Sequence, residues 1–244
     1  MLDPDEYGIW KGAIEAIERA GGLALVMGAP DTGKTTFCRL MAHHALAQNR
    51  TVSIVDADIG QSEIGPPGCI SLAQPAEPFT SMSDLEPSAI AFVGTISPRY
   101  AMMEHLAATC RVVAMARAGQ PHLVLCETTG FVKGPVAQRL KRAKVFALRP
   151  DHLVILSRRG QPSDASAPAS HDRLPAIYHL GVPKAITLKP PPLRLQRREA
   201  RFAGALNGSV VREWPLEHVR LTNTWLGSGT PLLQPACHQL SRRL

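Results

Sequence analysis

Nine consecutive residues near the start of the chain have the types and the spacing of a phosphate-binding loop. Residues 28–36 match the pattern G-x-x-x-x-G-K-[ST] and are Gly28, Ala29, Pro30, Asp31, Thr32, Gly33, Lys34, Thr35 and Thr36. In such a loop the backbone N–H groups point inward at phosphate oxygens, and the helix that follows adds partial positive charge at the same place. Lys34 would reach the β- and γ-phosphates, and the Thr35 hydroxyl would hold Mg²⁺. The loop therefore predicts a binding site for a nucleoside triphosphate.

Carboxylates stand at the ends of two predicted strands. Asp56 ends the strand-like run 51–56, Asp58 follows it, and Glu127 follows the run 122–126 at the Walker B position. Phosphoryl transfer needs one carboxylate for the metal shell and another to take the proton of the attacking hydroxyl. A turn capped by an Asp side chain would give the same pair spacing. We predict Thr35, Asp58 and Glu127 as metal ligands and leave open whether Asp56 or Asp58 is the base.

The elements that must position these residues alternate along the chain. We predict strands over residues 22–27, 51–56, 89–94, 122–126 and 151–156, and helices over residues 37–48, 100–118 and 136–144. Apolar strands separated by helices are typical of a parallel sheet that is covered on both faces. Such sheets bind ligands at the carboxyl ends of their strands. The predicted fold is α/β, a single P-loop NTPase domain over residues 1–244 with a mostly parallel sheet flanked by helices and a basic helical lid.

The last third of the chain has a different pattern. Residues 158–175 are rich in Pro, Ser and Ala, which predicts a mobile surface loop or linker. Beyond them we predict a short strand over residues 185–188, a proline run over 190–192, a basic helix, and a β-like region over 219–233.

Composition narrows the class of protein. Lys and Arg number 27 against 20 Asp and Glu, a formal net charge of +7, which makes a polyanionic partner plausible. The five cysteines lack C-x-x-C spacing, so we expect reduced thiols and no disulfide frame or zinc site. No apolar run approaches the roughly 20 residues that cross a bilayer, and the acidic start is unlike a signal peptide. We therefore expect a cytoplasmic protein without a membrane partner.

Five segments in order along the chain carry a resemblance to a known family. They are residues 30–35 (Pro-Asp-Thr-Gly-Lys-Thr), 55–61 (Val-Asp-Ala-Asp-Ile-Gly-Gln), 94–98 (Gly-Thr-Ile-Ser-Pro), 128–134 (Thr-Thr-Gly-Phe-Val-Lys-Gly) and 221–229 (Leu-Thr-Asn-Thr-Trp-Leu-Gly-Ser-Gly). Together they resemble the polynucleotide 5′-hydroxyl kinase family typified by the kinase of the eukaryotic pre-mRNA cleavage and tRNA-splicing machinery. Eukaryotic members carry flanking N- and C-terminal domains, whereas this chain has only about twenty residues before its first predicted strand. We therefore expect a stand-alone kinase core.

The resemblance implies an ATP- and Mg²⁺-dependent kinase that phosphorylates the 5′-hydroxyl end of RNA or DNA. It also implies a clasp on the acceptor. The substrate-binding residues implied here are Gln61, Thr128, Thr129, Gly130 and Phe131. Phe131 stands where the family has Trp, which keeps stacking but loses the indole N–H donor. Glu127 stands where the family more often has Asp or Asn.

A basic lid over the phosphates is implied as well, and residues 190–206 are the candidate. Arg194, Arg197, Arg198 and Arg201 share one face of a helix. Guanidinium groups on one face repel one another unless an anion or an acidic partner meets them, and their planar fork suits phosphate. We expect Arg194 and Arg198 to act in catalysis, and Arg197 and Arg201 to bind substrate. A solvated helix face is the alternative.

Other functions are open at this stage. The chain is alternatively an ATP-bound scaffold in an RNA-processing assembly, or a P-loop kinase or ATPase that acts on a small molecule. The acidic pair and the arginine face favour an enzyme, and the basic balance favours a polymer as substrate. A GTPase is disfavoured because the Asn-Lys-x-Asp motif is absent. No motif distinguishes RNA from DNA.

Overall fold

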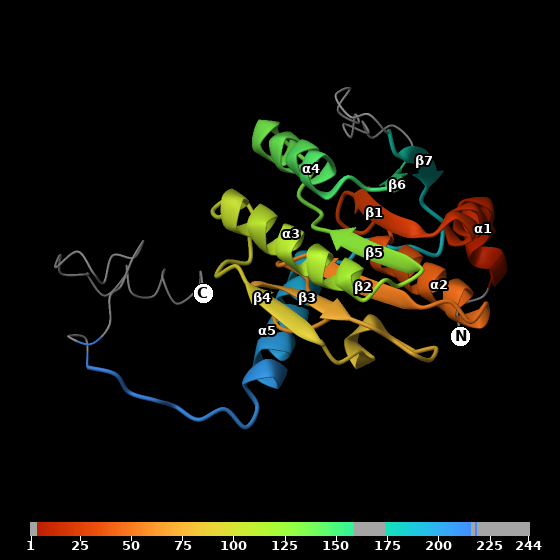
Figure 1. Cartoon of the computed structure of the whole chain (residues 1–244). Helices are drawn as coiled ribbons and strands as arrows, with labels where there is room; N and C mark the ends of the chain where they lie inside the picture. Colours follow the sequence, from red (N-terminus) through yellow and green to blue (C-terminus); the bar gives the residue numbers. More distant parts are fainter. Residues whose placement is uncertain (1–3, 159–173, 216–217, 219–244) are drawn as a thin grey trace. The chain divides into compact units, whose positions relative to one another are not determined.

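A single seven-stranded sheet organises the described residues. The computed structural model describes residues 4–158, 174–215 and 218, and the strand order within them is β4-β3-β2-β5-β1-β6-β7 (Figure 1). The strands are β1 (Gly22–Gly28), β2 (Val52–Ala57), β3 (Cys69–Ala73), β4 (Ala89–Phe92), β5 (Leu123–Thr128), β6 (His152–Ser157) and β7 (Ala176–Gly181). The helices are η1 (Pro4–Trp10), α1 (Lys11–Ala20), α2 (Lys34–Ala47), η2 (Met82–Asp84), α3 (Met102–Ala118), α4 (Pro135–Leu148) and α5 (Pro191–Leu206), where η marks a 3₁₀ helix.

The predicted mostly parallel sheet is confirmed. Strands β2, β5, β1, β6 and β7 run parallel to one another, whereas β3 is antiparallel to both β2 and β4. In the register of the sheet, Asp56 on β2 and Val26 on β1 both lie opposite Glu127 on β5. The end of the strand before the phosphate loop and two of the predicted carboxylates therefore meet at one edge of the sheet.

Helices cover both faces of the sheet (Figure 1). On one face α1 and α2 pack in a core that contains Trp10 and Phe37, whose rings meet edge to face at 5.4 Å. On the other face α3 and α4 contribute Val112 and Leu148 to a second core. Fully buried strands need apolar side chains on both sides, which explains why these strands read as continuous apolar runs. Trp10 also donates from Nε1 to the Gly181 carbonyl at 2.8 Å, which ties η1 to β7.

The predicted strand over residues 185–188 is wrong, because the strand in this part of the chain is β7 (Ala176–Gly181). A turn at residues 184–185 follows the buried Pro183, and the next residues lie along the phosphate loop. Ile186 lies against Gly33, and its carbonyl accepts from Arg158 Nη2 at 2.8 Å. Packing on the loop and the hydrogen bond from Arg158 thus hold this segment, and it pairs with no described strand of the sheet.

Strand β3 (Cys69–Ala73) was not predicted. It is five residues long and entirely buried, and it continues from the Pro-Gly turn at residues 67–68. A short apolar run next to Pro and Gly carries little periodic signal, and its strand conformation depends on pairing with both β2 and β4. The other predicted strands and helices are confirmed with shifted ends; the loop helix, for example, begins at Lys34 and not at Phe37.

The chain separates by its internal packing into two units, Met1–Ala205 and Leu206–Leu244, and the site described below lies in the first. The expectation of a single domain over residues 1–244 stays a prediction. The predicted loop at residues 158–175 falls mostly outside the described residues, as does all of the β-like region at 219–233. Within the described part of the chain, no helix has the length and apolar character that a membrane crossing requires.

Candidate active site

The phosphate loop connects β1 to α2, and hydrogen bonds within the loop hold its curled conformation. Gly33 has φ +87°, a left-handed conformation that favours glycine, and α2 begins at the next residue. A Cβ atom at Gly28 would lie 2.7 Å from the Leu156 carbonyl oxygen, so only glycine fits there. Ala29 O accepts from both Thr32 Oγ1, at 2.9 Å, and Lys34 Nζ, at 3.0 Å. The strand, glycine turn and helix N-terminus together form the anion cradle that the motif predicts.

A cavity of about 960 Å³ opens over this loop and gathers most of the predicted site residues. Its lining includes Pro30, Asp31, Gly33, Lys34, Thr35, Thr36, Asp58, Gln61, Glu127, Thr129, Gly130, Phe131, Arg194 and Arg198. The cavity size falls in the upper part of the range of about 300–1,000 Å³ that is usual for ligand sites. One hollow thus joins the phosphate loop, the carboxylates, the clasp and the lid.

Oxygen donors at the edge of this cavity fit Mg²⁺. Thr35 Oγ1 donates to Glu127 Oε1 at 2.6 Å, and Asp58 lines the same cavity. Among the described residues, no three His, Cys, Asp or Glu side chains converge as a ready-made metal site. Mg²⁺ commonly takes one or two carboxylates and completes its shell with water and substrate phosphates. The donor set therefore suits a metal that binds together with a triphosphate.

Burial raises the pKa of Glu127, and the nearby Asp56 raises it further, while Lys34 and the Thr35 hydroxyl act in the opposite direction. Burial also raises the pKa of Asp56, against the effect of three backbone N–H donors. Both shifts have the same physical cause, because negative charge is costly at a buried edge of the sheet. A divalent cation at this edge would stabilise the charged carboxylates.

The two aspartates have different environments. Asp56 is 3% exposed, and its carboxylate accepts from four donors, which are Asp58 N at 3.0 Å, Ser62 Oγ at 3.2 Å, Glu63 N at 2.7 Å and Ile64 N at 3.0 Å. Asp58 uses only Oδ1, which accepts from Gly60 N at 3.2 Å and Gln61 N at 3.3 Å, and it faces the cavity. Asp56 therefore organises the turn after β2, and Asp58 is the carboxylate that a substrate can reach.

The clasp segment is anchored from behind by a lysine that the sequence did not single out. Lys141 of α4 is 6% exposed, and its Nζ donates at 2.6 Å both to Thr128 Oγ1 and to the Thr129 carbonyl. Thr128 is fully buried and donates to Val26 O, so it supports the clasp and does not line the cavity. Phe131 does line the cavity, and the Arg99 guanidinium lies 5.8 Å from the centre of its ring.

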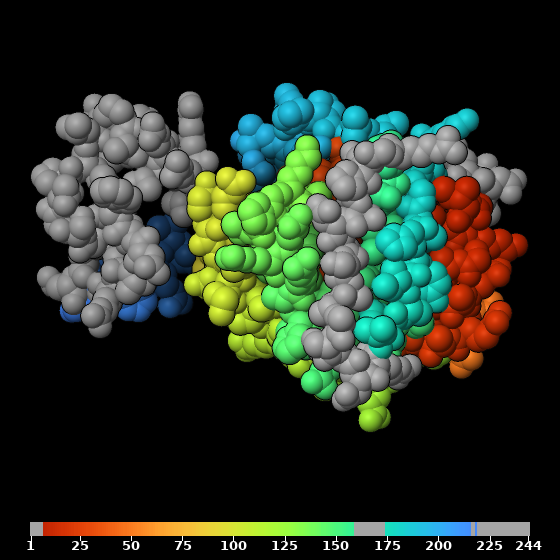
Figure 2. All heavy atoms as spheres, turned by 90° about the horizontal axis from the view of Figure 1, so that it is seen from above, coloured from red at the N-terminus to blue at the C-terminus, as the bar shows by residue number. Residues whose placement is uncertain are grey.

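Three of the four arginines of α5 contact acidic side chains or backbone carbonyls. Arg194 pairs with Asp31 at 2.5 Å, Arg197 lies 3.8 Å from Glu63, and Arg201 donates to the carbonyls of Glu63 and Gly65. Arg198 makes no ion pair with any described residue. No residue of α5 is buried, and Figure 2 shows this helix, in light blue, as part of the outer surface.

Several cations near the loop were missed by sequence reasoning. Lys189, Arg99 and Lys133 line the large cavity, and Arg39 lines a smaller one beside it. The only signal available in the sequence was that these residues lie close to predicted site segments. Lys189 precedes the proline run, Arg99 follows segment 94–98, and Lys133 lies within segment 128–134. Among the predicted residues, Arg197 and Arg201 line only the smaller cavity, and Gly28, Ala29, Thr32, Asp56 and Thr128 line neither.

Strands ordered in this way around a glycine loop, with an acidic residue on the neighbouring strand, are those of a P-loop NTPase. The family model described as mRNA cleavage and polyadenylation factor CLP1 P-loop matches residues 28–205. The chain belongs to this CLP1 P-loop family.

Curated relatives and solved structures agree with this assignment. A polyribonucleotide 5′-hydroxyl-kinase of Thermococcus kodakarensis is 33% identical over 208 residues, which cover 85% of this chain and 58% of the relative. A protein of the same name from Pyrococcus furiosus is 30% identical over 89% of this chain and 60% of its own length. The chain therefore spans less than two thirds of these relatives. A solved Clp1p–Pcf11p structure has the same fold, with a TM-score of 0.64 at 14% identity over 84% of this chain and 55% of that chain.

Proposed function

We propose that this chain is the core of an ATP-dependent polynucleotide 5′-hydroxyl kinase, which transfers the γ-phosphate of ATP to the 5′-hydroxyl end of RNA or DNA. The observation that carries the proposal is the single cavity in which the phosphate-loop residues Lys34 and Thr35 share walls with Asp58 and Phe131. The names of the archaeal relatives favour RNA as the acceptor. A triphosphate cradle alone would suit any P-loop protein, whereas a reachable carboxylate next to an aromatic clasp suits a hydroxyl acceptor.

The proposed reaction follows from these positions. Loop N–H groups and Lys34 hold the β- and γ-phosphates. Asp58 accepts the proton of the 5′-hydroxyl while the hydroxyl oxygen attacks the γ-phosphorus. The bond from that phosphorus to the β–γ bridging oxygen breaks, and ADP leaves. Arg194 and Arg198 of α5 face the same cavity and stabilise the negative charge that develops on the transferred group.

Mg²⁺ and stacking complete the proposal. Thr35 and Glu127 would hold Mg²⁺, which when bound neutralises charge on the β- and γ-phosphate oxygens, and Asp58 is left as the base. The Phe131 ring would stack on the first base of the acceptor, and Gln61, Thr129 and Gly130 line the cavity around it. A cytoplasmic location stays a prediction.

Transfer of label from [γ-³²P]ATP to 5′-hydroxyl oligonucleotides tests the proposal. We expect transfer by the wild-type protein, and Lys34→Ala should reduce its rate at least about 100-fold through loss of a charged phosphate contact. Lys184→Ala is the matched control, since Lys184 is exposed and lines neither cavity. Full transfer by Lys34→Ala would contradict the proposal.

The same assay separates the alternatives. ATP that is retained without any phosphorylated product would favour a scaffold. Equal transfer to nucleosides and to oligonucleotides would favour a small-molecule kinase. We expect oligonucleotides to be the better acceptors because the walls of both cavities carry an excess of cationic side chains.

A further inference from the structure

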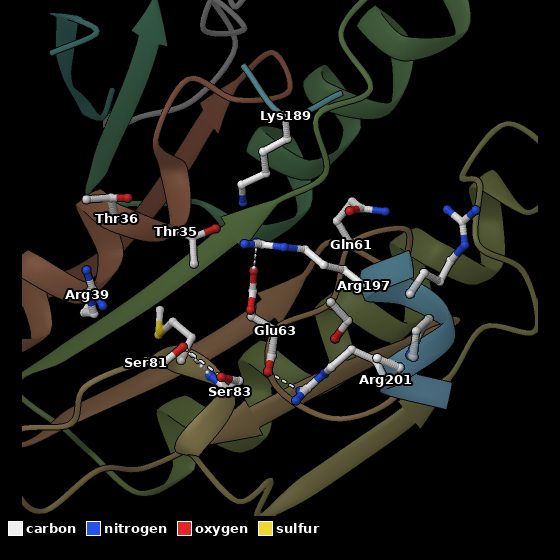
Figure 3. Close-up of a pocket in the computed structure, with 15 residues that line it drawn as sticks. Thr35, Thr36, Arg39, Gln61, Glu63, Ser81, Ser83, Lys189, Arg197 and Arg201 are labelled. Atoms are coloured by element: carbon white, nitrogen blue, oxygen red, sulfur yellow. Dashed lines mark hydrogen bonds and ion pairs between the residues drawn. The ribbon is translucent and has the colours of Figure 1, made fainter. Parts of the chain in front are cut away.

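A second hollow of about 510 Å³ lies beside the start of α2 (Figure 3). Its walls come from four parts of the chain, namely α2, the β2–β3 connection at residues 61–67, η2 with the preceding Ser81, and α5 with the preceding Lys189. Figure 3 shows Arg39 beside Thr36, Ser81 beside Ser83, and Lys189 pointing in from above Thr35. The hollow and the large cavity are continuous at the phosphate loop, because they share six lining residues: Thr35, Thr36, Gln61, Glu63, Lys189 and Arg198.

An excess of positively charged side chains around this hollow favours the binding of an anion. Its lining holds five cationic side chains, Arg39, Lys189, Arg197, Arg198 and Arg201, and one carboxylate, that of Glu63. Within the described part of the chain, only Arg197 among these five forms an ion pair. Arg201 Nε is buried and has no hydrogen-bond partner among the described residues. A buried N–H without a partner is costly, so this guanidinium has donor capacity that the described residues do not use.

Arg39 is placed to contribute to this site. One of its nitrogens, Nη1, donates to the Thr80 carbonyl, which holds the side chain against the segment before η2. A guanidinium has five N–H groups, so further donors are available toward the hollow. The Ser81 and Ser83 hydroxyls, 2.8 Å apart, lie on the same wall. Hydroxyls next to guanidinium groups are a donor set suited to phosphate oxygens.

The position of the hollow in the sheet indicates which substrate it receives. Its residues 61–67 leave β2, the strand whose end carries Asp58, and Ser81–Ser83 follow β3. The other side of the phosphate loop, toward β6 and β7, is bordered by residues 185–187 of the large cavity, where the nucleoside of the donor has room. The hollow therefore lies beside the β2–β3 connection, next to the segment that carries Asp58.

We propose that this hollow binds the phosphodiester backbone of the acceptor strand, on the 3′ side of its first nucleotide. The inference rests on the proposed kinase function and deepens it, because it explains why a polymer would be preferred to a nucleoside. The occupant is a polyanion, which matches the excess of cations, and it is continuous with the end that enters the large cavity.

The variant Arg39→Gln tests the proposal, because Gln removes the charge and keeps a polar side chain that suits a helix. Two acceptors are compared, a 5′-hydroxyl decanucleotide and an unphosphorylated nucleoside, which lacks the phosphate that the hollow would bind, with KM for ATP measured in parallel. We expect KM for the decanucleotide to rise on the order of tenfold, with KM for ATP and for the short acceptor unchanged. The slope of log KM against log salt concentration should fall by about 0.7, as for the loss of one phosphate contact with a single strand.

Two further variants sharpen the test. Arg111→Gln removes an exposed charge on α3, which covers the opposite face of the sheet from α2, and should change none of these constants. Arg39→Lys should keep the salt slope of the wild type. A rise in KM for ATP would assign the hollow to the donor, and an equal rise for both acceptors would assign it to the first nucleotide. Either result, or no change at all, overturns the proposal.

A binding measurement separates this proposal from the kinase function on which it rests. Fluorescence anisotropy of the labelled decanucleotide, without ATP, should show on the order of tenfold weaker binding by Arg39→Gln. If the wild-type protein binds the strand without phosphorylating it, the kinase proposal fails and the hollow is still tested. Unchanged binding by Arg39→Gln would reject the hollow as a strand site.

Discussion

The two aspartates after β2 should respond to substitution in different ways. Asp58→Asn keeps Oδ1 as acceptor for the N–H groups of residues 60 and 61 but removes the proton acceptor. We therefore expect kcat to fall by about 10²–10⁴, the usual contribution of a general base, with the free energy of unfolding changed by less than about 1 kcal/mol. Single-turnover transfer from ATP measures the first quantity, and urea unfolding measures the second.

Asp56→Ala should give the opposite result. It leaves three backbone N–H donors without their acceptor, whereas the Ser62 hydroxyl still has the Ile64 carbonyl at 2.8 Å; charge-assisted hydrogen bonds contribute about 1.5 kcal/mol each at the low end, or about 4.5 kcal/mol for the three. Relief from burying a carboxylate offsets part of this, so we expect a net loss of about 3 kcal/mol or more. Because domains are stable by about 5–15 kcal/mol, the variant should unfold at markedly lower urea concentration.

The conservative variant Asp56→Asn makes the reasoning refutable. It keeps one acceptor oxygen, so the folded fraction can be assayed, and kcat should stay within about tenfold of the wild type. A 100-fold fall in kcat at unchanged stability for Asp56→Asn, together with an active Asp58→Asn, would show that Asp56 is the base. The hydrogen-bond argument would then be refuted.

Three further predictions concern buried or paired charges. Burial lowers the pKa of Lys144 from 10.5 to about 8. The charged side chain therefore destabilises the folded protein below pH 8, and this cost disappears as the pH rises toward 10.5. Lys144→Met should accordingly stabilise the protein at pH 7 by up to about 3 kcal/mol. A stability difference between wild type and variant that stays flat with pH, measured by urea unfolding, would contradict this. Lys141→Met should raise KM for the acceptor several-fold at unchanged KM for ATP, because it removes both hydrogen bonds that Lys141 Nζ makes behind the clasp. Lys144→Met should change neither constant, since Lys144 Nζ has no hydrogen-bond partner among the described residues. Asp31→Asn removes a negative charge from the phosphate loop, so ATP binding measured by calorimetry should become several-fold tighter. The variant also weakens the contact between residue 31 and Arg194. Weaker ATP binding would show that this ion pair supports the nucleotide site.

Local patterns were sufficient for the loop and for most of the elements. The phosphate loop is contiguous, so its function as an anion cradle follows from nine adjacent residues, and Gly33 adopts the left-handed conformation that the motif requires. Strands buried on both faces show as apolar runs, which placed β1, β2, β5 and β6 within a few residues. Strands β3 and β7 were not predicted, because their runs of strand-forming residues are short and their pairing is with strands distant in sequence.

The division of labour within the site was decided by tertiary structure. Asp56 and Asp58 have the same chemistry and lie two residues apart, and only the return of the chain at residues 62–64 engages one carboxylate and leaves the other accessible. Lys141 and Arg39 have no local pattern that marks them, because their positions depend on packing between elements distant in sequence. The sequence by itself determined the triphosphate loop and the α/β sheet, since both arise from contiguous patterns. Which side chains face the substrate was determined by the fold, because burial and hydrogen-bond partners come from long-range contacts.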